Sequence, residues 1–284
     1  MRRLALVPTI VALAIFSLPV SGQDMTSVTR PEGSAALRGL HTADDARDWE
    51  AVGRLDTGVS FCTATLIAPD LVLTAAHCLF TEAGDRIADG NLTFSAGLRH
   101  GRAEAIRGVA QSRVPQGYAR PVGQADMQAI AQDLAVLRLD RAVSSGTVRP
   151  IAVGAAAPVL SAVTLVSYGA EREAFPSIED DCRVLSGFDT VQVLSCHVVS
   201  GSSGAPVVRI GPEGPQIVAI VSGRSDMAEG DVTVAVVAET LVEALIAAPA
   251  APVARSLQGS SITIRRVGDV GASREGMGAR FIRP

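Results

Sequence analysis

Residues 71–80 read LVLTAAHCLF and place a histidine and a cysteine directly after an apolar run. This run ends a longer stretch, VSFCTATLIAPDLVLTAAHC (59–78), in which apolar and β-branched residues form two extended segments. Ala68-Pro69-Asp70 separates the segments, and Pro and Asp favour tight turns, so two paired strands are predicted here. Taken alone, His77 could be a hydrogen-bonded core histidine and Cys78 a small buried residue.

The same pattern of short apolar segments continues along most of the chain. Short runs rich in Val, Leu and Ile recur between Gly and Pro residues, at 92–98, 105–115, 134–140, 158–169, 182–187, 191–199, 205–210, 215–223 and 231–237. Many short strands with close turns indicate an all-β barrel or sandwich. Only AETLVEALIAA (238–248) has apolar residues at helical spacing. We expect one β-rich domain over 50–248, with its halves at about 50–150 and 151–238 and a helix at about 238–248.

Composition sets broad limits on the class of protein. The chain has 284 residues, 48% of them hydrophobic and only 4% aromatic, so its core must rely on Val, Leu, Ile and Ala. The formal net charge is −4, and every basic residue apart from histidine is an arginine. Nothing in this pattern indicates a nucleic-acid surface, and we expect no nucleic-acid partner.

The first 22 residues resemble a secretory signal. Two arginines precede an apolar run over 4–20 that two prolines interrupt, and Val20 and Gly22 suit cleavage before Gln23. A transmembrane anchor is the alternative, but the run is short for spanning. No other stretch approaches 18 apolar residues without a charge. We therefore expect a signal peptide (1–22), a secreted or periplasmic protein, and no membrane span in the mature chain.

Two further segments flank the predicted domain. Residues 23–49 are polar and irregular and are interpreted as an N-terminal arm or pro-segment. Residues 249–284 begin with a Pro/Ala linker and continue as a tail with six arginines against Asp269 and Glu275, a net charge of +4. This tail could be disordered or loosely docked, or it could dock on the body or on an anionic envelope surface.

In an exported protein, the four cysteines are expected to form disulfides. An even number in an oxidising compartment indicates two disulfides, and sequence order suggests the local pairs Cys62–Cys78 and Cys182–Cys196. Closed loops of this size each stabilise by about 3 kcal/mol in the chain-entropy model. A zinc site with four thiolates is the alternative, but no Cys-x-x-Cys spacing supports it. No metal or cofactor is predicted.

Two later stretches suggest a chemical role for His77. In QDLAVLRL (132–139), Asp133 opens an apolar strand, where a carboxylate needs a hydrogen-bonding partner unless it merely caps the strand at the surface. In VSGSSGAPVV (199–208), Ser203 lies between Gly201 and Gly204. A loop rich in glycine can turn its N–H groups towards one point, as an oxyanion hole requires.

Histidine, aspartate and serine together predict nucleophilic catalysis. A serine hydroxyl is a poor nucleophile unless a base such as histidine takes its proton, and a buried carboxylate orients that histidine. The order His–Asp–Ser differs from the Asp–His–Ser of subtilisin-like enzymes and from the Ser–Asp–His of α/β-hydrolases. Ala205 also stands where the α/β-hydrolase G-x-S-x-G motif has its last glycine.

With LTAAHC, DLAVL and GSSGAP in this order, the chain resembles the chymotrypsin-like serine peptidases over about Val52 to Leu245. The resemblance implies two six-stranded antiparallel β-barrels with the active site between them. It also implies that His77 is general base and then acid, Asp133 orients it, and Ser203 attacks the substrate.

The resemblance assigns supporting roles as well. The N–H groups of Gly201 and Ser203 would form the oxyanion hole, and Ser222 would lie against the aspartate. Gly223 and Arg224 would lie on the segment that pairs with substrate backbone. Cys62–Cys78 would correspond to the family's disulfide that clamps the histidine loop.

The pattern departs from the family at several positions. Ser202 stands where the family usually has an aspartate, and no Ile-Val-Gly-Gly-like start is present, which brings the chain closer to a bacterial secreted branch similar to glutamyl endopeptidases. The glutamate-reading histidine of that branch would fall near Val221, so glutamate specificity is not supported. Asp231 in the pocket would favour Arg or Lys, whereas Arg224 or His197 would favour acidic or small residues. Each of the three could equally be a solvated surface charge.

The sequence therefore predicts a secreted, monomeric serine endopeptidase acting on protein or peptide substrates. A peptide- or envelope-binding protein that keeps the fold without turnover is one alternative. An esterase using the same triad is the other.

Overall fold

The structure is a computed structural model, and it describes residues 37–123, 125–227 and 230–248. The predicted signal peptide (1–22), the first part of the predicted arm (23–36), and the linker and tail (249–284) lie outside the described residues. Within the described residues, no helix is both long and apolar enough to cross a membrane.

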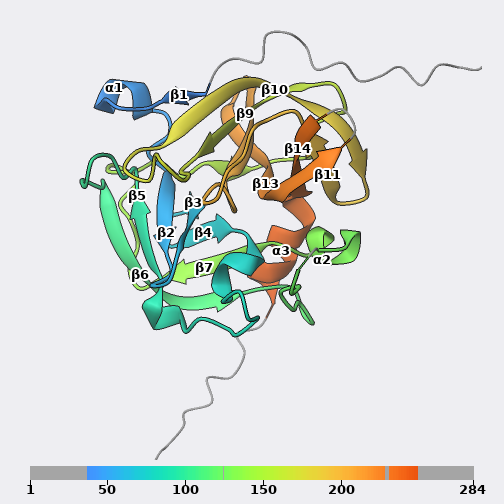
Figure 1. Ribbon diagram of the computed structural model, residues 1–284. Coiled ribbons are helices and arrows are strands. Elements are labelled where there is room, and N and C mark those ends of the chain that lie inside the picture. The colour runs from blue at the N-terminus through green and yellow to red at the C-terminus, as the bar shows by residue number, and fades with distance from the viewer. Residues whose placement is uncertain (1–36, 124, 228–229, 249–284) are drawn as a thin grey trace, which may run out of the picture. The chain divides into compact units, whose positions relative to one another are not determined.

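The first half of the chain forms a closed antiparallel barrel (Figure 1). In barrel order its strands are β2 (Val52–Asp56), β3 (Phe61–Ala68), β4 (Leu71–Thr74), β7 (Ala135–Leu139), β6 (Ala105–Arg113) and β5 (Thr93–Ala96). β3 and β4 are the predicted strand pair, and they join through Pro69 and Asp70 as expected. Leu55, Leu66 and Leu137 are fully buried in its core, because one face of each strand points inward.

A second closed barrel follows. Its strands in barrel order are β9 (Ala162–Ser167), β10 (Ser177–Phe188), β11 (Val191–Leu194), β14 (Gly230–Val237), β13 (Gly214–Met227) and β12 (Pro206–Gly211), and all neighbours pair antiparallel. Leu165, Leu194 and Val207 are fully buried inside it. The prediction of two six-stranded antiparallel barrels is confirmed. A short strand, β8 (Ala152–Val153), adds to β13 in parallel.

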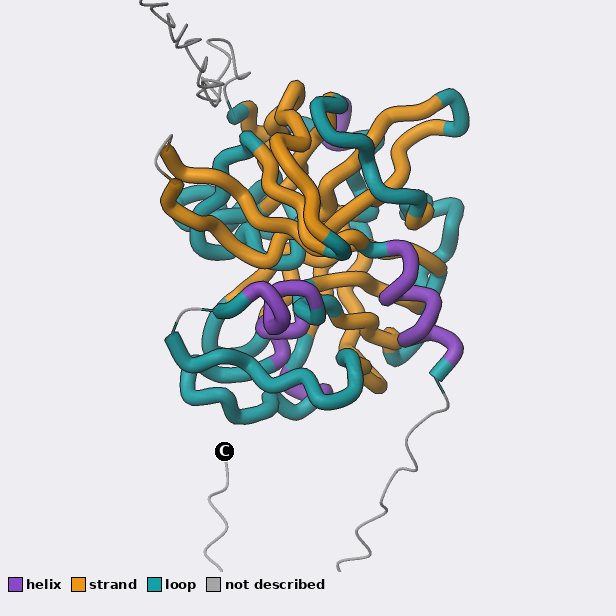
Figure 2. Tube along the Cα trace, turned by 90° about the vertical axis from the view of Figure 1, so that its right-hand side faces the viewer, coloured by secondary structure: helices purple, strands orange, loops and turns teal. Residues whose placement is uncertain are grey.

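In the part of the chain that the structure describes, three α-helices lie outside the barrels: α1 (Ala43–Ala46), α2 (Met127–Ala131) and α3 (Glu239–Ala247). Short 3₁₀ helices cover Ala76–Leu79 and Asp89–Asn91. The predicted C-terminal helix is α3, which follows β14 and contacts β7 of the first barrel. Figure 2 shows the helices outside the strands. Arg113 of β6 donates to the Leu245 carbonyl in the last turn of α3 at 3.0 Å. The helix therefore ties the two barrels together.

The N-terminal residues of the described chain are part of the fold. Strand β1 (Arg38–Gly39) pairs antiparallel with β10, beside which it runs in Figure 1. Leu40 is fully buried, and its N–H donates to the Pro176 carbonyl at 2.8 Å. The distal part of the segment interpreted as an arm or pro-segment thus contacts the second barrel.

Strand β10 begins earlier than the sequence predicts. The pattern indicates a strand from Cys182, but β10 begins at Ser177 and includes the acidic residues 179–181. The pairing with β9 shifts register between Glu179 and Cys182, and Asp181 has a φ of 67°. This bulge and the burial of Glu179 against a partner allow polar residues to occupy a strand that local propensity disfavours.

Candidate active site

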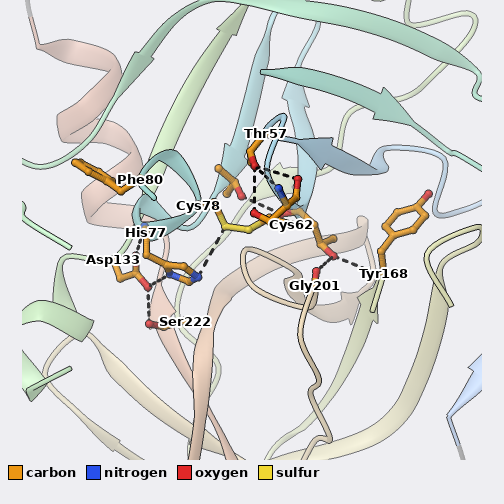
Figure 3. The surroundings of a disulfide bond; sticks show 12 residues. Thr57, Cys62, His77, Cys78, Phe80, Asp133, Tyr168, Gly201 and Ser222 are labelled. Atoms are coloured by element: carbon orange, nitrogen blue, oxygen red, sulfur yellow. Dashed lines mark hydrogen bonds and ion pairs between the residues drawn. A yellow bond between two sulfur atoms is a disulfide. The ribbon is translucent and has the colours of Figure 1, made fainter. Parts of the chain in front are cut away.

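His77 lies where β4 ends and a 3₁₀ helix begins. β4 is fixed between β3 and β7, and Ala76–Leu79 form the 3₁₀ helix immediately after it. Cys78 is bonded to Cys62 of β3, with 6.2 Å between their Cα atoms. The second predicted disulfide, Cys182–Cys196, is also present. The apolar run and the disulfide therefore hold His77 from both sides (Figure 3).

Asp133 lies just before β7 and is almost fully buried, with 4% of its surface exposed. Its Oδ2 is 2.7 Å from His77 Nδ1, and its Oδ1 accepts from the His77 N–H at 2.8 Å. Ser222 Oγ donates to the same Oδ2 at 2.6 Å, as Figure 3 shows. This geometry fixes Nδ1 on the carboxylate, while Nε2 lies 3.9 Å from the Cys78 sulfur of the disulfide (Figure 3).

A fourth donor reaches the same carboxylate. Tyr118, on the loop between β6 and α2, donates its hydroxyl to Asp133 Oδ1 at 3.0 Å. Each carboxylate oxygen therefore accepts two hydrogen bonds, which is about the full capacity of the group.

The charge of His77 and the hydrogen bonds around Asp133 together decide its protonation state. Burial by itself raises the pKa of Asp133, but the charge of His77 and the hydrogen bonds from His77 and Ser222 outweigh it, so this pKa lies below its ordinary value. Burial, with the nearby Asp133 charge, raises the pKa of Tyr118 far above its ordinary value. Asp133 is thus ionised and Tyr118 is a neutral donor at neutral pH.

Ser203 lies in the loop between β11 and β12. Gly201 has a φ of 92°, and a Cβ added to it would lie 2.3 Å from the Phe61 ring. Gly204 has a φ of 76°, and its Cβ would lie 2.4 Å from the Thr63 carbonyl. Both positions require glycine for their backbone conformation and for close packing on β3.

Strand β3 also holds the serine loop through hydrogen bonds. The Thr63 hydroxyl donates to the Gly201 carbonyl at 2.9 Å, and the Thr63 N–H donates to the Ser203 carbonyl at 2.9 Å. Across residues 37–123, 125–227 and 230–248, the N–H groups of Gly201 and Ser203 have no acceptor. Two unpaired N–H groups beside a serine are what binding of an oxyanion requires.

His77 and Ser203 line one cavity of about 510 Å³ that also reaches Gly201, Phe61 and Phe80. Among the described residues no hydrogen bond joins the Ser203 hydroxyl to the His77 ring. The structure thus brings the serine and histidine to one cavity, and it joins histidine, aspartate, Ser222 and Tyr118 in one network.

A family model described as trypsin matches residues 37–242, most of the chain. The chain belongs to the trypsin family. A solved structure entitled "Structure of Glu endopeptidase in complex with MPD" is similar in fold, with a TM-score of 0.61 and 19% sequence identity. That match covers 74% of this chain and 94% of the other.

This trypsin-family member has an unusual contact beneath its serine loop. Ser202, at the position where the family usually has aspartate, is fully buried and accepts from the Arg172 guanidinium at 3.4 Å. Arg172 also donates to the Ser167 carbonyl at 2.6 Å. Burial lowers the pKa of Arg172, while the charge of Glu179 acts in the opposite direction. The serine loop is therefore hydrogen-bonded to Arg172, which belongs to the connection between β9 and β10.

The predicted specificity residues occupy different environments. The His197 side chain is about half-exposed, and the His197 backbone N–H donates to the buried Glu179 carboxylate at 2.8 Å. Arg224 and Asp231 are exposed, Arg224 on β13 opposite Thr233, and Asp231 on β14 opposite Asp226. Open space surrounds the position of a Cβ on Gly223.

One group has the geometry of metal ligands. The sulfur atoms of Cys62 and Cys78 and a ring nitrogen of His77 lie within 4.8 Å of one another. Both sulfurs are bonded in the disulfide, so they cannot act as thiolate ligands, and we assign no metal to this group.

Sequence reasoning missed Tyr118, Arg172 and Glu179 as parts of this site. No motif contains them, and each reaches its partner through a loop or a bulge. The weak signals were an acidic run (179–181) directly before a predicted strand and a tyrosine in a chain with only two.

Proposed function

We propose that this trypsin-family protein is an exported, monomeric serine endopeptidase that hydrolyses peptide bonds in protein or peptide substrates. The observation that carries the proposal is the position of His77, which Asp133 orients and which shares a cavity with Ser203 and Gly201. The N-terminal apolar run and the two disulfides support export.

In the first half of the proposed reaction, Ser203 Oγ attacks the substrate carbonyl carbon while His77 Nε2 takes the hydroxyl proton. The carbonyl oxygen becomes an oxyanion, and the N–H groups of Gly201 and Ser203 donate to it. Asp133 stabilises the imidazolium that forms. His77 then gives the proton to the amine as the C–N bond breaks, which leaves an acyl ester on Ser203.

In the second half, a water molecule attacks the ester carbonyl and gives its proton to His77. A second tetrahedral oxyanion forms in the same position. When it collapses, the bond from the acyl carbon to Ser203 Oγ breaks and His77 returns the proton to that oxygen. The carboxylic acid product leaves, and the enzyme returns to its starting state without a metal or cofactor.

A fluorophosphonate probe tests the proposal directly, because it reacts with an activated serine and needs little substrate specificity. We expect the signal-free protein to be labelled at Ser203, as mapped by mass spectrometry, and His77→Ala to remain unlabelled. Ser203→Ala should keep the melting temperature and lose turnover by a factor of at least about 10³, since it does chemistry and no core packing. Undiminished hydrolysis by Ser203→Ala would refute the assignment.

A second function is favoured by one observation. Among the described residues, no hydrogen bond joins Ser203 to His77. A protein that keeps the fold but binds peptides or envelope components without turnover would lack this bond. Failure of the probe to label a folded protein would support this reading. An esterase would label at Ser203 and cleave an ester but not the amide of the same acyl group.

A further inference from the structure

The peptide between Ser200 and Gly201 carries one of the two N–H groups proposed to bind the oxyanion. Gly201 has a φ of 92°, and a glycine leaves the peptide before it free to adopt more than one orientation. In a trans peptide the carbonyl and the N–H point in opposite directions within one plane. The group that holds the Ser200 carbonyl therefore decides where the Gly201 N–H points.

The two N–H groups have different supports. The Ser202 carbonyl accepts from the Ala205 N–H at 3.0 Å, so the serine loop itself holds the peptide that carries the Ser203 N–H. The Ser200 carbonyl instead accepts from the Ala170 N–H at 2.8 Å, and Ala170 lies in the connection between β9 and β10. The orientation of the Gly201 N–H thus depends on a segment outside the serine loop.

Arg172 fixes the turn that carries Ala170. Its backbone N–H donates to the Gly169 carbonyl at 3.0 Å, and its Nη1 and Nη2 donate to the Ser167 carbonyl and hydroxyl at 2.6 and 3.2 Å. Ser167 is the fully buried last residue of β9. A Cβ added to Gly169 would lie 2.8 Å from Nη2, so the guanidinium packs directly on the turn. Arg172 therefore ties the turn to the end of a barrel strand.

The same guanidinium reaches the serine loop. Its Nη2 lies 3.4 Å from the hydroxyl of the buried Ser202, which in turn donates to the Tyr168 carbonyl at 3.2 Å. Hydrogen bonds from a charged donor are stronger than those between neutral groups, and the planar fork of an arginine can serve several acceptors at once. One side chain thus links the end of β9, the turn at Ala170 and the serine loop.

We infer that Arg172 is a positioning residue that holds the Ser200–Gly201 peptide in the orientation that binds the oxyanion. This inference rests on the proposed function. Arg172 does not line the cavity of His77 and Ser203, so it acts through Ala170 and Ser202 and touches no reacting atom. Without it, only a fraction of the molecules keeps the Gly201 N–H in place, and the rate of the reaction falls with that fraction.

The test compares the rate constant and the final extent of fluorophosphonate labelling at Ser203, together with kcat and KM for a cleaved peptide. Loss of one oxyanion donor lowers kcat by about 10² to 10³, so we expect Arg172→Ala, which displaces this donor in part of the population, to label about tenfold more slowly. Its kcat should fall equally, while KM stays the same, because the oxyanion forms only in the transition state. The extent of labelling should remain complete, whereas partial unfolding would lower the extent and leave the rate constant unchanged.

Arg99→Ala is the matched control. Arg99 lies in the loop between β5 and β6, its side chain is only 13% exposed, and it pairs with Glu104 at 2.8 Å. Its removal costs a similar partly buried arginine but leaves the turn at Ala170 intact, so both rate constants should match those of the unaltered protein. If Arg172→Ala does not fold, Arg172→Lys replaces it. A single ammonium lacks the fork that serves Ser167 and Ser202 together, so this variant should label at least about threefold more slowly.

The outcomes separate this inference from the proposed function. An unchanged labelling rate constant in folded Arg172→Ala, or in Arg172→Lys where it takes its place, would overturn the positioning role alone. A reduced extent with an unchanged rate constant, or an equal loss of rate in Arg99→Ala, would also overturn it. Absence of labelling and cleavage in the folded, unaltered protein would overturn the proposed function and this inference with it.

Discussion

At the scale of single residues, the site depends on how completely Asp133 is paired. Its carboxylate accepts from His77 twice, from Ser222 and from Tyr118, at 2.6 to 3.0 Å. A buried charge is tolerated only when it is paired in this way. The motifs in the sequence identify three of these residues. Tyr118 could not be predicted, because a loop conformation, and no local pattern, brings it to Asp133.

Tyr118→Phe tests what the fourth hydrogen bond does. The phenol places the positive end of its O–H dipole on the carboxylate and so weakens the stabilisation of the imidazolium. Without it, the imidazolium is more stable, and the acid limb of the kcat/KM profile should move to higher pH by roughly half a unit. A pH profile with a cleaved peptide measures this shift.

Tyr168→Phe is the matched control. The Tyr168 hydroxyl is also buried and donates to the Leu98 carbonyl at 2.8 Å, away from Asp133. Both variants lose one hydroxyl, but only Tyr118→Phe should move the acid limb. An unmoved limb in Tyr118→Phe would mean that its hydroxyl has a structural role alone.

At the scale of elements, β3 organises both halves of the site. It carries Cys62, which is bonded to Cys78 beside His77, and Thr63, which binds the Gly201 and Ser203 backbone. One strand of the first barrel thus fixes the histidine turn and the serine loop of the second barrel. The sequence predicts this strand and its disulfide, but the contacts of Thr63 with a loop about 140 residues later are a product of barrel packing.

Removal of the Cys62–Cys78 disulfide by the double change Cys62→Ser and Cys78→Ser should destabilise the protein. The two residues are 16 apart in sequence, and a loop of that size predicts a loss of about 3 kcal/mol in the free energy of unfolding. Urea unfolding monitored by circular dichroism measures it. An unchanged midpoint and slope would show that the bond does not stabilise the native state.

At the scale of the whole molecule, the N-terminal segment joins the two barrels. Leu40 belongs to a core cluster that also contains Val52 and Leu55 of the first barrel and Ile178 of the second. β1 adds to β10 directly before it. We therefore expect the mature enzyme to retain β1 and Leu40, so that processing of the predicted arm, if it occurs, ends before Arg38.

Leu40→Ala should lower the free energy of unfolding by about 2–5 kcal/mol, because it removes a fully buried side chain and leaves a cavity. Leu37→Ala is the control, since Leu37 is 42% exposed and should change stability by less than about 0.5 kcal/mol. Thermal unfolding of both variants measures the difference. Equal melting temperatures would indicate that the segment is dispensable and that the mature chain can start later.

The sequence by itself determined the all-β class, the strand pair β3–β4, both disulfide pairs and the order of histidine, aspartate and serine. These are local properties: the alternation of apolar residues, turn chemistry, cysteine order and short motifs. Tertiary structure alone decided that Tyr118 completes the Asp133 network, that Arg172 supports Ser202 and that Glu179 is buried in β10. Each of these depends on a distance between residues that folding brings together, and such distances leave no periodic or spacing signal in one chain.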